Sequence, residues 1–294
     1  MNILITGATG MVGRALTARL LKNADKITAF SRSIDKAKQI LSSQVDVVTH
    51  LDMDFSQFDA VINLAGEPIF DHYWTETQKQ KLWDSRINLT RTLAEKINQA
   101  TQPPHIFISA SAVGFYGDCG DNAVTESHPS GNSFTARLCV EWEKQALQAN
   151  GRVCLIRTSN ILSHSDGMLT KILPLYQWGL GGKLGSGTQF MSWIHLQDMV
   201  NGIIHLLHHP TAQGAFNFSA PNPVRNGKFN QILGKCLNRP HFLPIPAFAL
   251  KLVFGERAYL LLDSVQAVPN KLSESGFIFE FEKLENALRH LLHK

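Results

Sequence analysis

Two side chains that could exchange protons with a bound ligand lie at the ends of predicted strands or helices. Glu67 comes soon after an apolar run at residues 60–64, and His195 lies just before a helical pattern that starts at residue 196. A carboxyl group gains a pKa suited to acid/base chemistry when it is partly buried, whereas an imidazole titrates near neutrality without help. Each has an ordinary alternative: Glu67 could cap or pair within its loop, and His195 could be a structural residue at a helix start.

A glycine pattern near the amino terminus predicts a phosphate-binding turn. The apolar run at residues 3–5 leads to Gly7-x-x-Gly10-x-x-Gly13, and a helical pattern follows. In this order the first glycine permits a tight turn, the second lets the backbone approach a pyrophosphate, and the third lets the helix pack closely on the sheet. The same turn can also occur without a ligand. The predicted dinucleotide site consists of Thr6, Gly7, Thr9, Gly10, Met11, Val12 and Gly13.

The second predicted strand indicates which dinucleotide binds. An NAD site usually has an Asp or Glu about 20 residues beyond the glycines, but this place reads Phe30-Ser31-Arg32-Ser33. Arg32 can pair with a 2′-phosphate and Ser31 can donate to it, and a charge-assisted bond contributes about 1.5–3 kcal/mol. We therefore predict NADP(H) rather than NAD(H), with a solvated loop charge at Arg32 as the alternative. Further cofactor contacts are predicted at Asp54, near the adenine, and at Leu64, Ala65 and Gly66.

Strand-like and helical patterns alternate over the first three quarters of the chain. The predicted strands are at residues 3–6, 27–30, 45–48, 60–64, 105–109, 153–157 and 215–218. The predicted helices are at residues 11–22, 75–100, 134–148 and 196–208. Short, almost continuously apolar strands are typical of a parallel sheet that is covered on both faces. The alternation predicts an α/β fold with a doubly wound, Rossmann-type parallel sheet of about seven strands.

The pattern changes after residue 220, where prolines cluster and the alternation of strands and helices stops. Short helices are predicted there at residues 227–237, 247–254 and 281–292. We expect residues 1–164 and 191–220 to form an NADP-binding domain, and residues 165–190 and 221–294 to form a smaller lobe. This lobe would cap the carboxyl edge of the sheet, where doubly wound folds bind their substrates.

The composition narrows the class of protein. The 294 residues are 44% hydrophobic, and the net charge of +4 is the small difference between 28 basic and 24 acidic residues. That charge is too weak to indicate nucleic-acid binding, and no apolar stretch approaches the roughly 18 residues of a membrane span. Four separated cysteines without a C-x-x-C motif indicate free thiols in a reducing compartment. We expect a cytoplasmic protein with a small-molecule substrate and no nucleic-acid or membrane partner.

Three histidines near the end of a predicted helix could suggest a metal site. His205, His208 and His209 fall in the last turn before Pro210. Solvated histidines at a helix carboxyl terminus are favourable for electrostatic reasons. We therefore predict no metal site.

Three motifs in the first half of the chain are more informative together than each is alone. They are the glycine pattern with Thr6, the segment Asn63-Leu64-Ala65-Gly66, and residues 109–117, Ser-Ala-Ser-Ala-Val-Gly-Phe-Tyr-Gly. Together they resemble the extended short-chain dehydrogenase/reductases, which include nucleotide-sugar epimerases and dehydratases. Other segments are similar to a subfamily of epimerase family proteins that end in a C-terminal domain of unknown function, namely residues 66–69, 83–87, 181–187, 191–195 and 219–224. The resemblance implies a Rossmann-type NAD(P) domain and an unassigned reaction.

The resemblance also indicates which catalytic groups to expect. In the superfamily a serine or threonine orients the substrate carbonyl, and a Tyr-x-x-x-Lys pair supplies the acid/base. Ser111 matches the family serine, and Tyr116 could reach the substrate; the alternatives are a turn serine and a ring packed beneath its loop. The Tyr-x-x-x-Lys pair is missing from the sequence. If Phe134 occupies the tyrosine position of the expected helix, Leu138 occupies the lysine position. A phenyl ring cannot transfer a proton.

The glycine-rich segment at residues 179–187 has two interpretations. With Lys183 it could form an anion-binding loop, because the corresponding region of extended family members contacts the nucleotide or phosphate of the substrate. Glycine richness alone also marks a mobile surface loop.

Three functions fit these residues. The first is an NADP-dependent oxidoreductase or epimerase-like enzyme with a non-standard acid/base, for which the catalytic candidates are Ser111, Glu67, Tyr116 and His195. The second is a non-catalytic NADP(H)-binding protein, either a redox sensor or an assembly partner. The third is a lyase or dehydratase that uses the cofactor transiently. A homodimer through the helices at residues 75–100 and 134–148 is common in the superfamily, although no residue demands it.

Overall fold

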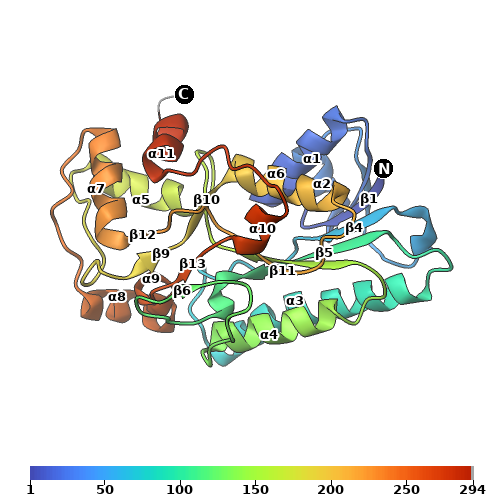
Figure 1. The fold of residues 1–294 in the computed structure, drawn as a ribbon, viewed down its shortest axis with the longest axis horizontal. Coiled ribbons are helices and arrows are strands. Elements are labelled where there is room, and N and C mark those ends of the chain that lie inside the picture. Colours follow the sequence, from blue (N-terminus) through green and yellow to red (C-terminus); the bar gives the residue numbers. More distant parts are fainter. Residues whose placement is uncertain (293–294) are drawn as a thin grey trace.

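A parallel sheet of seven strands forms the centre of the molecule in a computed structural model that describes residues 1–292 (Figure 1). Its strands are β1 Asn2–Thr6, β2 Lys26–Phe30, β3 Asp46–Val48, β4 Ala60–Asn63, β5 Ile106–Ala112, β7 Val153–Thr158 and β11 Gly214–Phe218. They lie in the order β11-β7-β5-β4-β1-β2-β3, and every neighbouring pair is parallel. All seven predicted strands are present, and the doubly wound α/β fold is confirmed.

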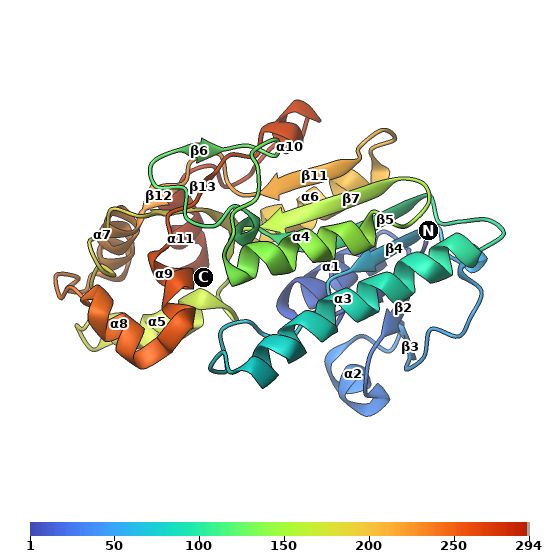
Figure 2. The same cartoon turned by 90° about the horizontal axis from the view of Figure 1, so that it is seen from below.

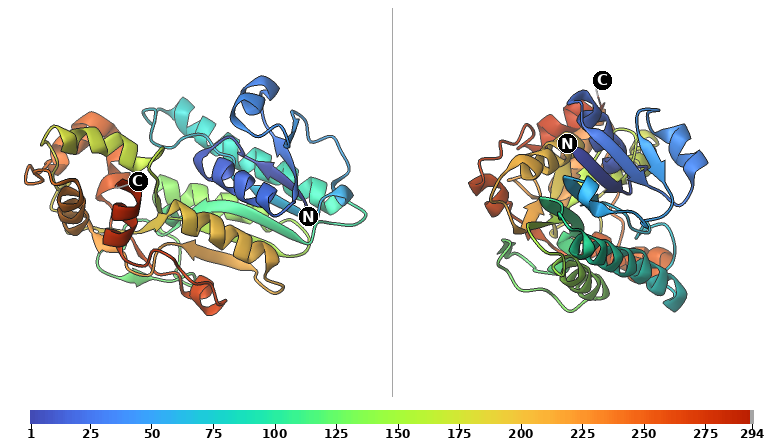
Figure 3. Two further views of the ribbon diagram at one scale, coloured as in Figure 1. Left: turned by 90° about the horizontal axis from the view of Figure 1, so that it is seen from above. Right: turned by 90° about the vertical axis from the view of Figure 1, so that its right-hand side faces the viewer.

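Helices cover both faces of this sheet, as Figures 1 and 2 show from two sides. One face carries α1 (Met11–Lys22), α2 (Ile34–Ile40) and α6 (Leu196–His208), and the other carries α3 (Glu76–Gln99) and α4 (Phe134–Ala146). Figure 3 shows α1 and α6 lying across the first face. The central strands are therefore inaccessible to water on both sides, which explains their continuous apolar runs.

The strand order reverses direction beside β1, which pairs with β2 on one side and β4 on the other. In doubly wound folds the crevice outside the carboxyl ends of the strands at such a point is the usual ligand site. Thr6 ends β1 and Asn63 ends β4, so the segments that follow these two residues line that crevice.

A smaller lobe lies beyond the carboxyl edge of the sheet (Figure 1). Its helices are α5 (Met168–Gln177), α7 (Asn226–Leu237), α8 (Ala247–Phe254), the 3-10 turn η3 (Gly255–Ala258), α9 (Tyr259–Leu262) and α11 (Leu284–Leu292). Trp193, Phe229, Leu233 and Leu288 are buried in its separate core. The lobe has its own hydrophobic core, so it can present a stable wall to a ligand bound at the sheet edge.

One segment of the tail departs from the predicted division of the chain. Helix α10 (Asn270–Glu274) packs beside β11, and Leu272 and Phe279 join the hydrophobic core on the sheet. Residues near 270–280 thus return to the first domain instead of staying in the lobe. This crossing ties the two parts of the molecule together.

Short elements connect the two parts. The strand pairs are β6 (Ala123–Val124) with β13 (Gln266–Ala267), β8 (Asn160–Leu162) with β10 (Trp193–His195), and β9 (Phe190–Met191) with β12 (Val224–Arg225). Two 3-10 turns, η1 (Phe55–Gln57) and η2 (Val113–Phe115), follow β3 and β5. Among residues 1–292, no helix combines the length and the apolar character needed to cross a membrane.

Candidate functional site

The turn after β1 is closed to any side chain at two of its glycines. Gly7 has a φ of +70°, and a Cβ there would lie 2.6 Å from the Leu64 carbonyl carbon. A Cβ on Gly13 would lie 2.2 Å from the carbonyl oxygen of Gly7. Both distances are too short for atoms that are not bonded to each other, so the turn requires glycine at these positions. The backbone is thereby held close to the start of α1, as a pyrophosphate-binding turn requires.

The amino terminus of α1 is available to an anion. Gly10 is its N-cap, and no side chain caps the helix there. The first backbone N–H groups of an α-helix have no intrahelical acceptor, and the helix dipole adds a partial positive charge. Gly10 is exposed, and Met11 and Val12 are half-buried. The structure therefore has the features that dinucleotide phosphates need, at the predicted residues.

A buried polar network supports the floor of this crevice. The Thr6 hydroxyl donates to Asn63 Oδ1 over 2.6 Å, and it accepts a hydrogen bond from the Ala65 N–H at 3.3 Å. The Asn63 amide donates to Thr90 Oγ1 at 2.8 Å and to Ser109 Oγ at 3.2 Å. These bonds fix the ends of β1, β4 and β5 relative to one another. Thr6 thus has a positioning role. Leu64 and Ala65, which follow Asn63 at the end of β4, lie at the edge of the crevice.

The side chains predicted to select the cofactor lie at the carboxyl end of β2. Arg32 is exposed, and no ion pair engages it within the described part of the chain. The Ser31 hydroxyl donates to the Ser33 carbonyl at 3.1 Å, and the Ser33 hydroxyl caps α2 by accepting from the Lys36 N–H. Arg32 is therefore free to meet a phosphate, whereas Ser31 is engaged in its own turn.

Asp54 has a structural role that the sequence did not indicate. Its carboxylate accepts a hydrogen bond from the Ser56 N–H at 2.9 Å and so caps η1. This bond lowers the pKa of the Asp54 carboxyl below its usual value. The neighbouring Ser56 contacts Thr101, which precedes β5. The predicted adenine contact of Asp54 stays a prediction.

Glu67 lies at the carboxyl edge with its backbone held at both ends. Its N–H donates to Ser85 Oγ at 3.1 Å, and its carbonyl accepts from Arg86 Nη2 at 2.9 Å. A Cβ on the adjacent Gly66 would lie 3.1 Å from the Arg86 guanidinium, so only glycine leaves this approach open. Glu67 is half-buried, and no hydrogen bond from residues 1–292 reaches its carboxylate. The side chain is therefore available for acid/base chemistry.

Ser111 faces away from an open crevice and into the protein. It is 3% exposed, and its hydroxyl donates to Glu143 Oε1 on α4 at 2.6 Å. The same carboxylate forms a two-point ion pair with Arg157 of β7, with Nε–Oε1 and Nη2–Oε2 both at 2.8 Å. Ser111 thus completes the hydrogen bonding of a buried ion pair. The structure supports a structural role for this serine and speaks against the predicted catalytic one.

Tyr116 belongs to the same buried network. Its hydroxyl donates to Asn217 Oδ1 at 2.7 Å and accepts from Arg157 Nη1 at 3.0 Å. Burial raises the pKa of the Tyr116 hydroxyl, against the opposing effect of Arg157. The ring is 3% exposed. The alternative of a packed ring beneath its loop is therefore the one that the structure supports.

His195 is also structural. Its Nδ1 accepts a hydrogen bond from the Gln197 N–H at 3.0 Å and so caps α6, while its Nε2 lies 3.2 Å from His290 Nδ1. The ring stacks on Phe281 with centroids 3.9 Å apart. With 3% of its surface exposed, it lies between α6 and the smaller lobe. These contacts remove His195 from the catalytic candidates.

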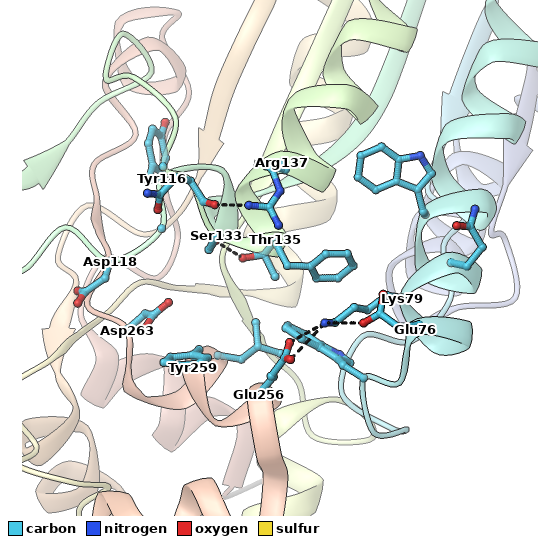
Figure 4. Close-up of a pocket in the computed structure, with 18 residues that line it drawn as sticks. Glu76, Lys79, Tyr116, Asp118, Ser133, Thr135, Arg137, Glu256, Tyr259 and Asp263 are labelled. Carbon is cyan, nitrogen blue, oxygen red and sulfur yellow. Dashed lines mark hydrogen bonds and ion pairs between the residues drawn. The ribbon is translucent and has the colours of Figure 1, made fainter.

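A cavity of about 720 Å³ lies where the first turns of α3 and α4 meet η3 and α9 (Figure 4). These two helices follow β4 and β5, so the cavity is at the carboxyl edge of the sheet. Phe134, which we predict at the position of the family tyrosine, lines it beside Trp74, with ring centroids 5.3 Å apart. Trp83 lines it too, one turn of α3 before Arg86. The volume is typical of a small-molecule site.

Asp263, which was not among the residues predicted from the sequence, enters the cavity from the smaller lobe (Figure 4). Burial raises the pKa of its carboxyl group to about 6, with a smaller contribution from the neighbouring Asp118 carboxylate. No hydrogen bond from residues 1–292 reaches the Asp263 carboxylate. No motif surrounds it in the sequence, because it meets Asp118 only through folding.

The glycine-rich segment has a packing explanation. A Cβ on Gly182 would lie 1.3 Å from the Leu243 carbonyl oxygen, and one on Gly181 would lie 2.5 Å from the Tyr176 ring. The Ile245 N–H donates to the Lys183 carbonyl at 2.9 Å. The segment is thus pressed against residues 241–245, and none of it lines the cavity. Its glycines are required by close packing in the smaller lobe.

Two family models match the chain. The model described as "NAD dependent epimerase/dehydratase family" matches residues 3–218, and a domain of unknown function (DUF1731) matches residues 245–291. The second match covers α8, η3, α9 and most of α11, which are the elements of the smaller lobe after residue 245.

Relatives match the chain over nearly its whole length. The chloroplastic SDR39U1 homologue of Arabidopsis thaliana, an epimerase family protein, is 39% identical over 302 residues, which cover 99% of this chain and 87% of the relative. The epimerase family protein YfhF of Bacillus subtilis is 35% identical, covering 99% and 98%. The crystal structure of human SDR39U1 (isoform 2) with NADPH has a TM-score of 0.91 and 30% identity, covering 100% of both chains. The chain belongs to the NAD dependent epimerase/dehydratase family, in its NAD(P)-binding subfamily with a C-terminal DUF1731 domain.

Proposed function

We propose that this protein binds NADP(H) and acts on a small molecule as an oxidoreductase or epimerase-like enzyme with a non-standard acid/base. The observation that carries the proposal is the joint presence of a glycine turn closed to side chains and a small-molecule cavity at the same sheet edge. The NADPH in the human relative's structure supports the phosphorylated cofactor. When bound, NADP(H) supplies or accepts a hydride at its nicotinamide ring.

Distinct residues of the chain have distinct tasks in this proposal. The backbone N–H groups of Met11, Val12 and Gly13 bind the pyrophosphate, because the α1 terminus lacks a side-chain cap. Arg32 binds the 2′-phosphate. Glu67 is the proposed acid/base, because its backbone is fixed by Ser85 and Arg86 and no hydrogen bond from residues 1–292 reaches its carboxylate.

A turnover assay tests the enzymatic part of the proposal. The NADPH-loaded protein is mixed with a panel of small carbonyl compounds and sugar nucleotides, and the reduced-nicotinamide absorbance is followed. We expect Glu67→Gln to lower turnover at least about 100-fold, which is the lower range of general acid/base catalysis. Glu95→Gln, an exposed change on α3, is the matched control and should leave turnover unchanged. Equal turnover in the two variants would remove Glu67 from the mechanism.

A second candidate function is a non-catalytic NADP(H)-binding protein that serves as a redox sensor or assembly partner. It is favoured by Phe134 at the position of the family tyrosine and by the engagement of Ser111 with Glu143. NADPH binding without turnover on any member of the panel would support it. A homodimer through α3 and α4 and a cytoplasmic location stay predictions, and light scattering of the purified protein tests the first of them.

A further inference from the structure

The 720 Å³ cavity has aromatic walls on several sides. Trp74 and Phe134 meet edge to face, with their ring planes at 60°. Trp83 and the half-exposed Tyr259 add two more rings from α3 and α9. Aromatic faces bind the rings of ligands by burial and stacking, and their negative quadrupole also attracts cations. The walls therefore fit a ring-bearing molecule better than a purely polar one.

Both helix termini that face the cavity are already capped. Thr75 accepts a hydrogen bond from the Gln78 N–H at the start of α3, and Ser133 accepts one from the Ala136 N–H at the start of α4. Glu76 adds a negative charge to the first turn of α3. By contrast, the α1 terminus has no side-chain cap. Helix termini bind phosphate through free N–H groups, and at α3 and α4 a side-chain cap already accepts one of them, whereas at α1 no side chain does.

Of the two cations that line the cavity, Lys79 is paired with carboxylates, whereas Arg137 has one hydrogen bond to a backbone carbonyl (Figure 4). Lys79 pairs with Glu76 at 3.2 Å and with Glu256 at 3.0 Å. Arg137 donates to the Asn132 carbonyl at 2.7 Å. Four carboxylates line the same space, so acidic groups outnumber basic ones: Glu76, Asp118, Glu256 and Asp263. A nucleoside diphosphate carries two phosphates that need cations, and this cavity offers them only the Arg137 guanidinium, which no carboxylate of residues 1–292 pairs with.

We propose that the cavity binds a ring-bearing molecule that is neutral or positively charged, with Asp263 as its polar contact, and that it rejects nucleoside diphosphate sugars. This inference rests on the proposed function, because it names the substrate class for the cavity at the same edge of the sheet as the cofactor turn. The Asp263 carboxylate accepts a hydrogen bond or a cation from the ligand. No group of the protein does so in the described chain.

The test uses NADPH-loaded protein and three probes with the same phenyl ring and different charges: benzylamine, benzyl alcohol and benzoate. Binding is followed at pH 8 by the NMR signals of the Trp74 and Trp83 indole N–H groups, with UDP-glucose as a fourth probe. We expect benzylamine to bind at least tenfold more tightly than benzoate, and UDP-glucose to leave both signals unmoved. Asp263→Asn should reduce the preference to threefold or less. Asp52→Asn, a change at a surface pair with Lys96, is the matched control.

Three results would overturn the inference. They are equal affinities for the charged probes, movement of both indole signals by UDP-glucose, and an unchanged preference in Asp263→Asn. NADPH affinity is measured separately, by cofactor fluorescence before any probe is added. Failure to bind NADPH would contradict the proposed function, whereas binding of NADPH together with UDP-glucose would contradict only the substrate class.

Discussion

The carboxyl edge of the sheet differs between its two halves. At the ends of β1 and β2, the α1 terminus is uncapped and Arg32 is exposed without an ion pair in the described chain. At the ends of β5 and β7, the polar groups of Ser111, Glu143 and Arg157 are buried and bonded to one another. One half offers donors to a ligand, and the other has used its donors to stabilise the fold.

The difference between the two halves shows how to tell residues that bind a ligand from residues that stabilise the fold, even where they match a family motif. A polar group that is buried and fully paired contributes mainly to the stability of the native state. Removing its partner leaves a buried polar group without a hydrogen bond. A donor left without a protein partner at a crevice is available to a ligand. Ser111 matches the family serine by sequence, but its bond to Glu143 places it in the first class.

The largest expected effect comes from a substitution in the buried half, at the ion pair of Glu143 and Arg157. Glu143→Ala leaves the Arg157 guanidinium buried without its countercharge, so we expect the free energy of unfolding to fall by about 3–5 kcal/mol. Although burial alone would lower the pKa of Arg157, the bonds to Glu143 hold it above its ordinary value, which shows how closely the two are coupled. Urea unfolding measures the loss. Glu141→Ala, which removes a surface pair with Lys144, is the control and should cost about 0–1 kcal/mol; equal costs would contradict a structural role for Glu143.

The next effect concerns the cofactor half. Gly13→Ala places a Cβ against the Gly7 carbonyl oxygen, and we expect a loss of about 3 kcal/mol in stability together with weaker NADPH binding. Gly10→Ala is the control for stability alone, because its Cβ would lie 3.3 Å from the same oxygen and its φ of −74° suits any residue. Thermal unfolding of both variants and NADPH titration of Gly13→Ala check this. If Gly13→Ala behaved like Gly10→Ala, the turn would not require glycine there.

The smallest expected effect concerns the Asp263 carboxyl group in the cavity. Because the folded-state pKa of Asp263 is raised to about 6 from its usual 3.8, the folded protein binds this proton more tightly than the unfolded chain. Stability should therefore fall as pH rises from about 4 to about 6. Asp263→Asn removes the free-energy cost of burying a charged carboxylate. It should stabilise the protein by about 1 kcal/mol at pH 7, after allowance for solvent screening. The gain should vanish below about pH 4; a gain that does not change with pH would contradict burial of the charge.

Much of the fold follows from local sequence patterns. Helices α1, α6 and α8 span the residues predicted for them, since their apolar periodicity is uninterrupted. Helix α5 was not predicted, because Pro174 interrupts it and glycines flank it. Helix α10 and the return of residues near 270–280 to the sheet depend on tertiary packing against β11. No periodicity within the tail could indicate that contact.

The candidate site could be predicted only where it is local in sequence. The strand, turn and helix around Gly7 lie within one continuous segment, so the spacing of the glycines was sufficient. Ser111 and Tyr116 find their partners 32 and 101 residues away, and His195 finds His290 95 residues away. Asp263 and Asp118 are likewise brought together only by folding. A single sequence therefore indicated the cofactor turn but not the roles of these side chains.

The most direct test of the difference between the two halves is the ratio of NADPH to NADH affinity, measured by fluorescence titration. We expect the unmodified protein to prefer NADPH about 10- to 100-fold, through a charge-assisted bond from Arg32. Arg32→Ala should abolish the preference without changing NADH affinity, whereas Lys22→Ala at the far end of α1 should retain it. Equal affinities in the unmodified protein, or a preference that survives in Arg32→Ala, would contradict the account.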